Sequence, residues 1–437
     1  MRTRFRLCTV FLLFAVLTVA NAAEDWTRFR GPHGSGVSEI RSLPTRWSAD
    51  SKIAWKTPLP GGGVSSPVLW GDRIFVTAYS GFDRWQRSDE FGSLKLHVVC
   101  LKASDGAILW QDAIDSEGKR RRGGYGGTRH HGYASHTPVV DGDAVYAFFG
   151  PDGVYAYSHD GKRLWESSVG TRKDSWGTAA SPILHDGLLI FNASAESGSL
   201  VALDPETGEE VWRQRPLGRT WATPVIAHAD GRSELVLNVP GQVLAYDPGS
   251  GDPLWWCDNA RDYASSSPVV DEGIIYSVVA NTHGGSGSVA VRADGSEDVA
   301  DTHVIWRGDW GAQVSSPGYH AGYVYWSSIN PRVGRNGRAV YCADGETGEL
   351  VYKHKLDPEP KVIYASPLIA DGKVYYLSQQ AGMYVLSEGP EFELLAHNRI
   401  ESEPEDSYFN ASPVPLEGGR LLLRSDWGLY CIGQNAE

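Results

Sequence analysis

Short apolar segments separated by tight turns recur along most of the chain, and they share one pattern. Each begins with Ser or Thr followed by Pro and an apolar pair, and most continue through an acidic or glycine turn such as Asp141-Gly142. Further short strands and a turn that leads to Trp follow, as between Ala202 and Trp212. Such self-similarity predicts a repeated unit of four short strands. The repeat starts eight times, at Ser66-Pro67, Thr137-Pro138, Ser181-Pro182, Thr223-Pro224, Ser267-Pro268, Ser316-Pro317, Ser366-Pro367 and Ser412-Pro413.

A single four-stranded unit cannot bury both faces of its sheet, so neighbouring units must pack face to face. Radial closure then removes the exposed sheet edges. The pattern therefore predicts an all-β protein, an eight-bladed β-propeller with four-stranded antiparallel blades. Aromatic residues recur on the predicted outer strands, where we expect them to pack between blades; they are Trp110, Trp165, Trp212, Trp255, Trp306 and Tyr352.

The eighth unit ends near Ile432 and has no outer strand of its own. The segment Ile53-Ala54-Trp55 has the character of an outer strand, yet it precedes the first Ser-Pro. We therefore expect this N-terminal strand to complete the last blade and close the ring.

The N-terminus has the features of a secretory signal peptide. Three arginines lie within the first six residues, an apolar stretch runs from Leu7 to Val19, and Ala20-Asn21-Ala22 has the small-x-small form of a cleavage site. That stretch is shorter than the ~20 residues needed to span a bilayer. We expect residues 1–22 to be removed and residues 23–437 to form one propeller domain.

The signal peptide predicts that the protein is exported to the periplasm or secreted, and that it does not span the membrane. The only cysteine near the cleavage site, Cys8, lies inside the signal peptide, so no lipid attachment is expected. The net charge of −13 argues against nucleic acid as a partner. We expect a monomer.

Four cysteines follow the signal peptide. Cys100, Cys342 and Cys431 occupy the position that alanine fills on the third strand of other units. Equivalent positions in different blades lie too far apart for a disulfide, which needs Cα atoms within ~7 Å. We predict buried, reduced thiols at these positions and at Cys257.

The repeat, with Ala-Leu-Asp-x-x-Thr-Gly before Trp212, resembles the pyrroloquinoline-quinone (PQQ) type propeller family, which includes quinoprotein dehydrogenases and BamB. The segments from Asp25 to Pro32 and from His131 to Ser135 resemble a BamB-like group abundant in planctomycetes and related bacteria. This resemblance implies a non-catalytic binding or scaffold protein of the periplasm or cell envelope. Its implied partner is an envelope protein, a peptide or a glycan, and no cofactor is expected.

Aromatic residues just before the innermost strands are expected to ring one mouth of the central channel. Such a ring can stack on a planar ligand, or it can simply plug the mouth, and the sequence leaves both possibilities open. The candidate ligand-binding residues are Tyr133, Trp176, Trp221, Tyr263, Trp310, Tyr364, Arg129 and His131. Phe409 precedes the last inner strand in the same way.

The long insertions all fall in connections that lead to one end of an antiparallel blade. They lie between Tyr79 and Leu94, Ile114 and Tyr133, Asn281 and Gly287, and Ile329 and Arg338. Long loops on a rigid scaffold commonly carry binding residues. The basic run Lys119 to Arg122 lies in one of them. Such a run can recognise phosphate, carboxylate or an acidic partner, but a mobile charged loop is the commoner explanation.

The alternative implied by the resemblance is a PQQ-dependent dehydrogenase that oxidises an alcohol or sugar, with PQQ above a calcium ion. Asp309 is the acid we would nominate as its base. However, no two cysteines are adjacent, unlike the alcohol-oxidising members, and no Cys-x-x-Cys-His haem site is present. His130 and His131 have no third ligand at fixed spacing, so no metal site is predicted.

Overall fold

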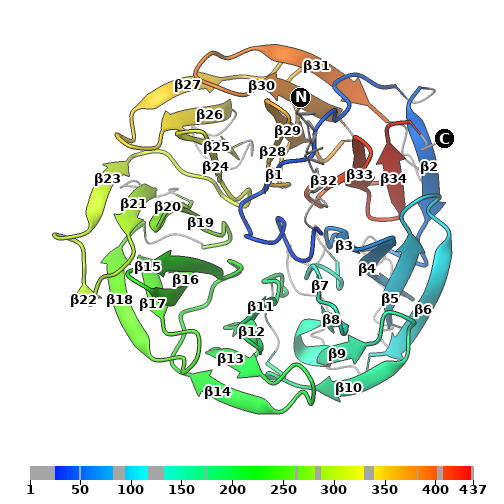
Figure 1. Ribbon diagram of the computed structural model, residues 1–437, viewed down its shortest axis with the longest axis horizontal. Coiled ribbons are helices and arrows are strands. Elements are labelled where there is room, and N and C mark those ends of the chain that lie inside the picture. The colour runs from blue at the N-terminus through cyan, green and yellow to red at the C-terminus, as the bar shows by residue number, and fades with distance from the viewer. Residues whose placement is uncertain are drawn as a thin grey trace, which may run out of the picture.

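Eight antiparallel sheets surround a central channel like the blades of a propeller (Figure 1). The structure is a computed structural model, and it describes residues 25–48, 51–81, 94–116, 132–172, 174, 176–260, 264–280, 287–328, 339–380, 382–400 and 407–434. Within these ranges the regular elements are strands and one 3-10 turn, η2 (Gly150–Asp152). The predicted fold class is confirmed.

Each blade follows the chain outward, from an inner strand at the channel to an outer strand at the rim. Blades 1 and 2 contain β3 (Val68–Trp70), β4 (Arg73–Ser80), β5 (Lys95–Lys102), β6 (Ile108–Asp115), then β7 (Val139–Val140), β8 (Val145–Phe148), β9 (Val154–Tyr157) and β10 (Arg163–Ser167). Blades 3 and 4 contain β11 (Ile183–His185), β12 (Leu188–Ala193), β13 (Ser199–Leu203), β14 (Glu210–Gln214), then β15 (Val225–Ala229), β16 (Arg232–Val239), β17 (Gln242–Tyr246) and β18 (Pro253–Asp258).

The second half of the ring repeats this arrangement. Blades 5 and 6 contain β19 (Val269–Asp271), β20 (Ile274–Val278), β21 (Ser288–Arg292), β23 (Val304–Gly308), then β24 (Gly318–His320), β25 (Tyr323–Ser328), β26 (Ala339–Asp344) and β27 (Leu350–His354). Blade 7 contains β28 (Leu368–Ala370), β29 (Lys373–Leu377), β30 (Gly382–Ser387) and β31 (Leu394–Arg399). A short strand, β22 (Glu297–Asp298), extends the outer edge of blade 4.

Blade 8 combines the two ends of the chain. Its inner strands are β32 (Val414–Leu416), β33 (Arg420–Arg424) and β34 (Gly428–Ile432). The outer strand is β2 (Ile53–Pro58), which pairs antiparallel with β34 and sets Trp55 opposite Cys431. The predicted closure by the N-terminal strand is confirmed.

Tryptophans of the outer strands hold adjacent blades together at the rim. Five of them lie against a glycine of the tight turn in the next blade, where an added Cβ would approach the indole to between 2.4 and 2.7 Å. The turn also needs a positive φ, which glycine adopts at little cost. The pairs are Trp55 with Gly106, Trp110 with Gly161, Trp165 with Gly208, Trp212 with Gly251, and Trp306 with Gly348. In most of them the indole N–H also donates to a carbonyl of that turn, as Trp165 does to Pro205 at 2.9 Å. Trp255 on β18 differs, because its indole N–H donates to the Glu234 carboxylate at 2.7 Å.

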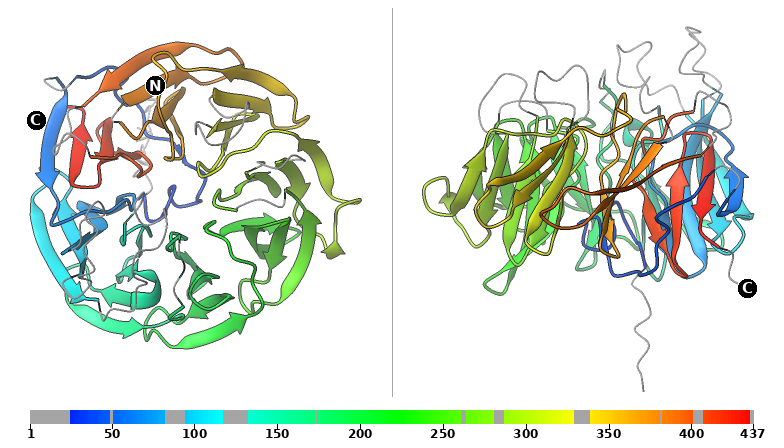
Figure 2. Two further views of the ribbon diagram at one scale, coloured as in Figure 1. Left: turned by 180° about the vertical axis from the view of Figure 1, so that it is seen from behind. Right: turned by 90° about the horizontal axis from the view of Figure 1, so that it is seen from above.

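The segment before β2 crosses one end of the channel, a feature that the repeat did not predict (Figures 1 and 2). Its carbonyls at Trp26 and Thr27 accept hydrogen bonds of 2.9 Å from Leu69 in blade 1 and Val140 in blade 2. Further on, β1 (Val37–Ser38) pairs in parallel with β28 of blade 7. This segment, residues 25–38, is called the plug below, because it closes one mouth of the channel.

The four cysteines of the described chain are buried and free, as predicted. Burial raises the pKa of the Cys100 and Cys342 thiols to about 12 and that of Cys431 to about 11. The thiols therefore stay protonated at neutral pH and behave as small apolar groups in the core.

The rim contact between Trp165 and Gly208 can be tested with a matched pair of substitutions. Gly208 and Gly187 have nearly equal φ values of +74 and +73, but a Cβ at Gly208 meets Trp165 at 2.6 Å, whereas a Cβ at Gly187 meets nothing within 4 Å. We expect Gly208→Ala to lower the free energy of unfolding by about 1–3 kcal/mol more than Gly187→Ala, because overpacking adds to the backbone strain. Denaturant melts measure the difference, and equal losses would contradict the contact.

Candidate functional site

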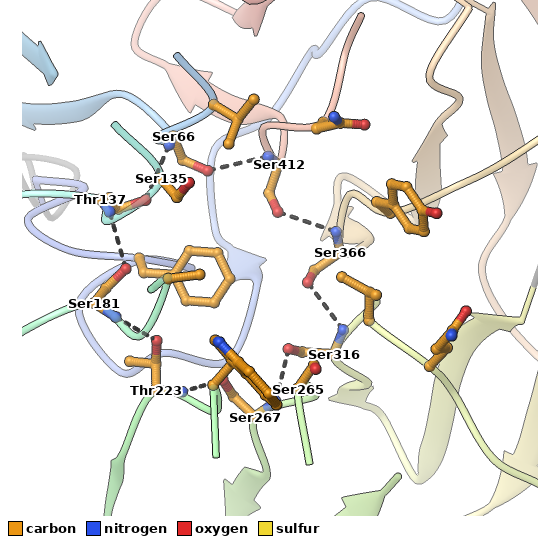
Figure 3. A pocket seen from close by; sticks show the side chains of 18 of the residues that line it. Ser66, Ser135, Thr137, Ser181, Thr223, Ser265, Ser267, Ser316, Ser366 and Ser412 are labelled. Carbon is orange, nitrogen blue, oxygen red and sulfur yellow. Dashed lines mark hydrogen bonds between the residues drawn. The ribbon is translucent and has the colours of Figure 1, made fainter. Parts of the chain in front are cut away.

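A closed ring of hydrogen bonds surrounds the channel at the start of the inner strands (Figure 3). In each blade the backbone N–H of the Ser or Thr before Pro donates to the hydroxyl oxygen of the same residue in the next blade, at 2.9–3.0 Å. The last bond runs from Ser412 to Ser66 and completes the circle. The members, called the hydroxyl ring below, are Ser66, Thr137, Ser181, Thr223, Ser267, Ser316, Ser366 and Ser412.

The sequence produces this ring through the residue pair that starts each repeat. The proline that follows fixes an extended backbone at the preceding residue. A hydroxyl at that position then reaches the N–H of the neighbouring blade. The same short contact in every repeat brings eight buried N–H groups and eight hydroxyls together around one axis.

Buried arginines support the ring from outside. Arg424 donates to the carbonyls of Ser65 at 2.6 Å and Thr77 at 2.5 Å, and so ties blade 8 to blade 1. Arg30 of the plug donates to the carbonyl of Pro317, next to ring member Ser316. Burial lowers the pKa of both guanidinium groups to about 9. These arginines join blades and plug, and neither lines the cavity described next.

A cavity of about 340 Å³ lies within the ring, and the aromatic side chains of Trp176, Trp221 and Tyr364 contribute to its lining. Phe29 of the plug contributes to its lining, which shows that the plug limits its depth. None of the described lining residues carries a formal charge. Besides the hydroxyl ring, they are Phe29, Val64, Ser135, Trp176, Ala179, Trp221, Ser265, Gln313, Val314, Tyr364 and Asn410.

Two tryptophans form a rigid aromatic wall. Trp221 donates its indole N–H to the Gly177 carbonyl at 2.9 Å, and the guanidinium of Arg219 lies 5.2 Å from its ring centroid. Arg219 in turn pairs with Asp174 at 3.0 Å. Trp176 is held nearby by its backbone N–H, which donates to the same Asp174 at 2.8 Å, and its side chain is 43% exposed. An exposed indole beside a fixed one provides a stacking surface.

The structure brings together three of the predicted site residues and separates others. Trp176, Trp221 and Tyr364 line the cavity. Tyr133 is buried and packs edge-on against Tyr79 with ring centroids 5.4 Å apart. Trp310 packs against the hydrophobic cluster between blades 5 and 6 and is not part of the lining.

The other aromatic and loop predictions divide in the same way. Phe409 is fully buried against Tyr430, so it belongs to the core. Arg129, His131 and Tyr263 lie outside the described residues, as do Lys119 to Arg122 and most of the four long insertions. Among the residues that the structure describes, no three His, Cys, Asp or Glu side chains gather as a metal site requires.

Sequence reasoning missed Phe29, Gln313, Asn410 and the functional meaning of the Ser/Thr-Pro pairs. The recurrence of Ser or Thr before Pro in all eight repeats was a usable signal for this role. A turn needs only the proline, so a hydroxyl at every equivalent position indicates a further function for that side chain. The cavity role of Phe29 had no such signal, because it depends on the plug crossing the channel.

Comparisons with known proteins agree with this architecture. The family profile described as outer membrane protein assembly factor BamB matches residues 91–215 and 196–298. The outer membrane protein assembly factor BamB of Burkholderia pseudomallei is 24% identical over 411 residues, which cover 80% of this chain and 93% of that protein. A polyvinylalcohol dehydrogenase of Pseudomonas is 26% identical over 204 residues, covering 41% of this chain and 28% of that enzyme.

A solved structure extends the likeness to the whole ring. The quinohemoprotein alcohol dehydrogenase from Comamonas testosteroni superposes with a TM-score of 0.64 at 14% identity, covering 96% of this chain and 82% of that one. At this identity the match shows the fold alone. The repeats of this chain are therefore similar to those of the PQQ-type β-propeller family. The profile named for BamB covers residues 91–298, and the resemblance to a planctomycete group stays a prediction.

The hydroxyl ring makes a prediction about stability. In Ser366→Ala the buried N–H of Ser316 loses its acceptor, which should lower the free energy of unfolding by about 1–3 kcal/mol. Ser366→Thr is the matched control, because Thr137 and Thr223 already serve in the ring. Urea melts of both variants test this; equal stability of the two would show that the hydroxyl contributes nothing.

Proposed function

We propose that this protein is an exported, non-catalytic PQQ-type propeller that acts as a binding or scaffold protein in the periplasm or cell envelope. The observation that carries the proposal is the cavity inside the hydroxyl ring, closed below by the plug and walled by Trp176 and Trp221. Its partner is an envelope protein, a peptide or a glycan. The similarity to a protein named as an outer membrane assembly factor supports an envelope role.

The chemistry of the lining supports binding over catalysis. General acid or base catalysis needs a titratable group within hydrogen-bond reach of the substrate. The described lining offers hydroxyl, amide, aliphatic and aromatic groups. Its titratable side chain is the phenol of Tyr364, and it has no carboxylate, imidazole, thiol or amine. Such a surface holds a ligand by stacking and hydrogen bonding.

Export rests on the predicted signal peptide, which lies outside the described residues. No helix among the described residues is long and apolar enough to cross a membrane. The four buried free cysteines need no disulfide partner and agree with either a reducing or an oxidising compartment.

The second candidate, a PQQ-dependent dehydrogenase, is favoured by the sequence similarity to a polyvinylalcohol dehydrogenase. PQQ is an anionic tricarboxylate and calcium prefers carboxylate and carbonyl oxygens. The described lining offers calcium the side-chain amide oxygens of Gln313 and Asn410 but no carboxylate, and it offers PQQ no cation. Asp309 is exposed and lies outside this lining. The residues present do not fit the group, so we derive no catalytic step through it.

The aromatic wall can be tested by removing it. We expect Trp176→Ala and Trp221→Ala each to weaken partner binding by about 1–3 kcal/mol, the range known for stacked planar groups. Trp256→Ala is the control, because Trp256 is similarly exposed (37% against 43% for Trp176) but lies on β18 at the rim. Partner recovery from a periplasmic extract, beside thermal melts, measures both effects. Destabilised variants with undiminished recovery would make the aromatics a structural plug.

Reconstitution separates the two candidates. The protein mixed with PQQ and calcium should acquire no bound-cofactor absorbance and should not oxidise alcohols or sugars with a dye as acceptor. Stoichiometric PQQ binding with dye reduction would reject the non-catalytic proposal.

A further inference from the structure

The hydroxyl ring has unused hydrogen-bonding capacity. Each Ser or Thr oxygen accepts one backbone N–H, but a hydroxyl also has a proton to donate and a second lone pair. In the described contacts the protons of these ring hydroxyls have no protein acceptor. Since all eight residues line the cavity, their remaining capacity is available to whatever occupies it.

The cavity also presents flat apolar surface. Trp176, Trp221 and Phe29 contribute aromatic groups to its lining, and Val64 and Val314 add aliphatic ones. Trp221 is held by Gly177 and Arg219, so its ring plane is fixed before a ligand arrives. A preorganised platform loses little conformational freedom on binding.

Electrostatics disfavour charged ligands. The described lining carries no formal charge, and Arg219 and Asp174, which contact the two tryptophans, form an ion pair with each other. The net charge of −13 repels anions over longer distances. A charged group placed in the cavity would lose its hydration without gaining a counter-charge.

An ordinary apolar peptide side chain fits these features only in part. It would cover the tryptophans but leave the hydroxyl protons without acceptors, which costs free energy for each buried donor. A sugar ring matches both the tryptophans and the hydroxyl ring. Its apolar C–H faces can stack on the indoles, and its hydroxyls can both donate hydrogen bonds to and accept them from the Ser and Thr hydroxyls. A volume of about 340 Å³ is at the small end of the ~300–1,000 Å³ typical of ligand sites.

We infer that the cavity binds a neutral carbohydrate, the end of a short glycan, stacked on Trp176 and Trp221 with its hydroxyls directed to the hydroxyl ring. This inference rests on the proposed binding function and assigns its ligand class. It gives the polar ring and the aromatic wall complementary roles in one site.

The test uses the whole mature protein and four defined sugars. Glucose, maltose and N-acetylglucosamine are the neutral probes, and glucuronate is the charged counterpart of glucose. Binding is followed by calorimetry and by tryptophan fluorescence. We expect saturable binding of at least one neutral sugar, and glucuronate binding about tenfold or more weaker than glucose.

Variants assign the binding to the cavity. Trp176→Ala and Trp221→Ala should weaken sugar binding by about tenfold or more, while Trp176→Phe retains part of it and Trp256→Ala leaves it unchanged. Thermal melts confirm that the variants remain folded. Sugar binding that survives both alanine substitutions would overturn the assignment of the site.

The remaining outcomes separate this inference from the proposed function. If no neutral sugar binds, but partner recovery from extract still depends on Trp176 and Trp221, the carbohydrate inference fails and the binding function stands. Glucuronate binding as tight as glucose would likewise refute the neutral site. If neither sugars bind nor partner recovery depends on the tryptophans, both proposals fail.

Discussion

Each blade begins with one short hydrogen bond to its neighbour, from a backbone N–H to a Ser or Thr hydroxyl, and the eight bonds form a circle. To close this ring, every blade must provide one Ser or Thr, and the last of them, Ser412, must form a hydrogen bond with the first, Ser66. At the outer rim, the N-terminal strand β2 pairs with β34 and joins the two ends of the chain in one blade. Closure is thus achieved twice, at the channel by Ser412 and Ser66 and at the outer rim by β2 and β34.

The tryptophans join neighbouring blades at the outer rim, as the hydroxyls join them at the channel. Five of these indoles lie against a glycine that a larger residue could not replace without displacing the indole, as Trp165 does against Gly208. Between these two layers lie the apolar faces of the sheets, including the buried thiols of Cys100, Cys342 and Cys431. The blades are therefore fixed to one another at both ends, which makes the channel a stable frame for a ligand.

The same frame hosts different chemistry in its relatives, because function depends on the lining and not on the blades. Here the inner strands bring hydroxyls to the axis, while Phe29 of the plug and Trp176 and Trp221 of the mouth add aromatic groups. The lining gains hydrogen-bonding capacity and stacking surface without charge. That combination of groups is the basis of the binding function proposed above.

The sequence by itself determined the repeat and hence the all-β ring, its closure by Ile53 to Trp55, and the unpaired cysteines, because these follow from a local pattern and its period. It also placed Trp176, Trp221 and Tyr364 at the cavity. It could not separate them from Tyr133 and Phe409, which occupy the same repeat position but are buried. Only the tertiary structure decided that difference, and the role of Phe29, because side-chain exposure at the mouth depends on neighbouring blades and on a plug far away in sequence.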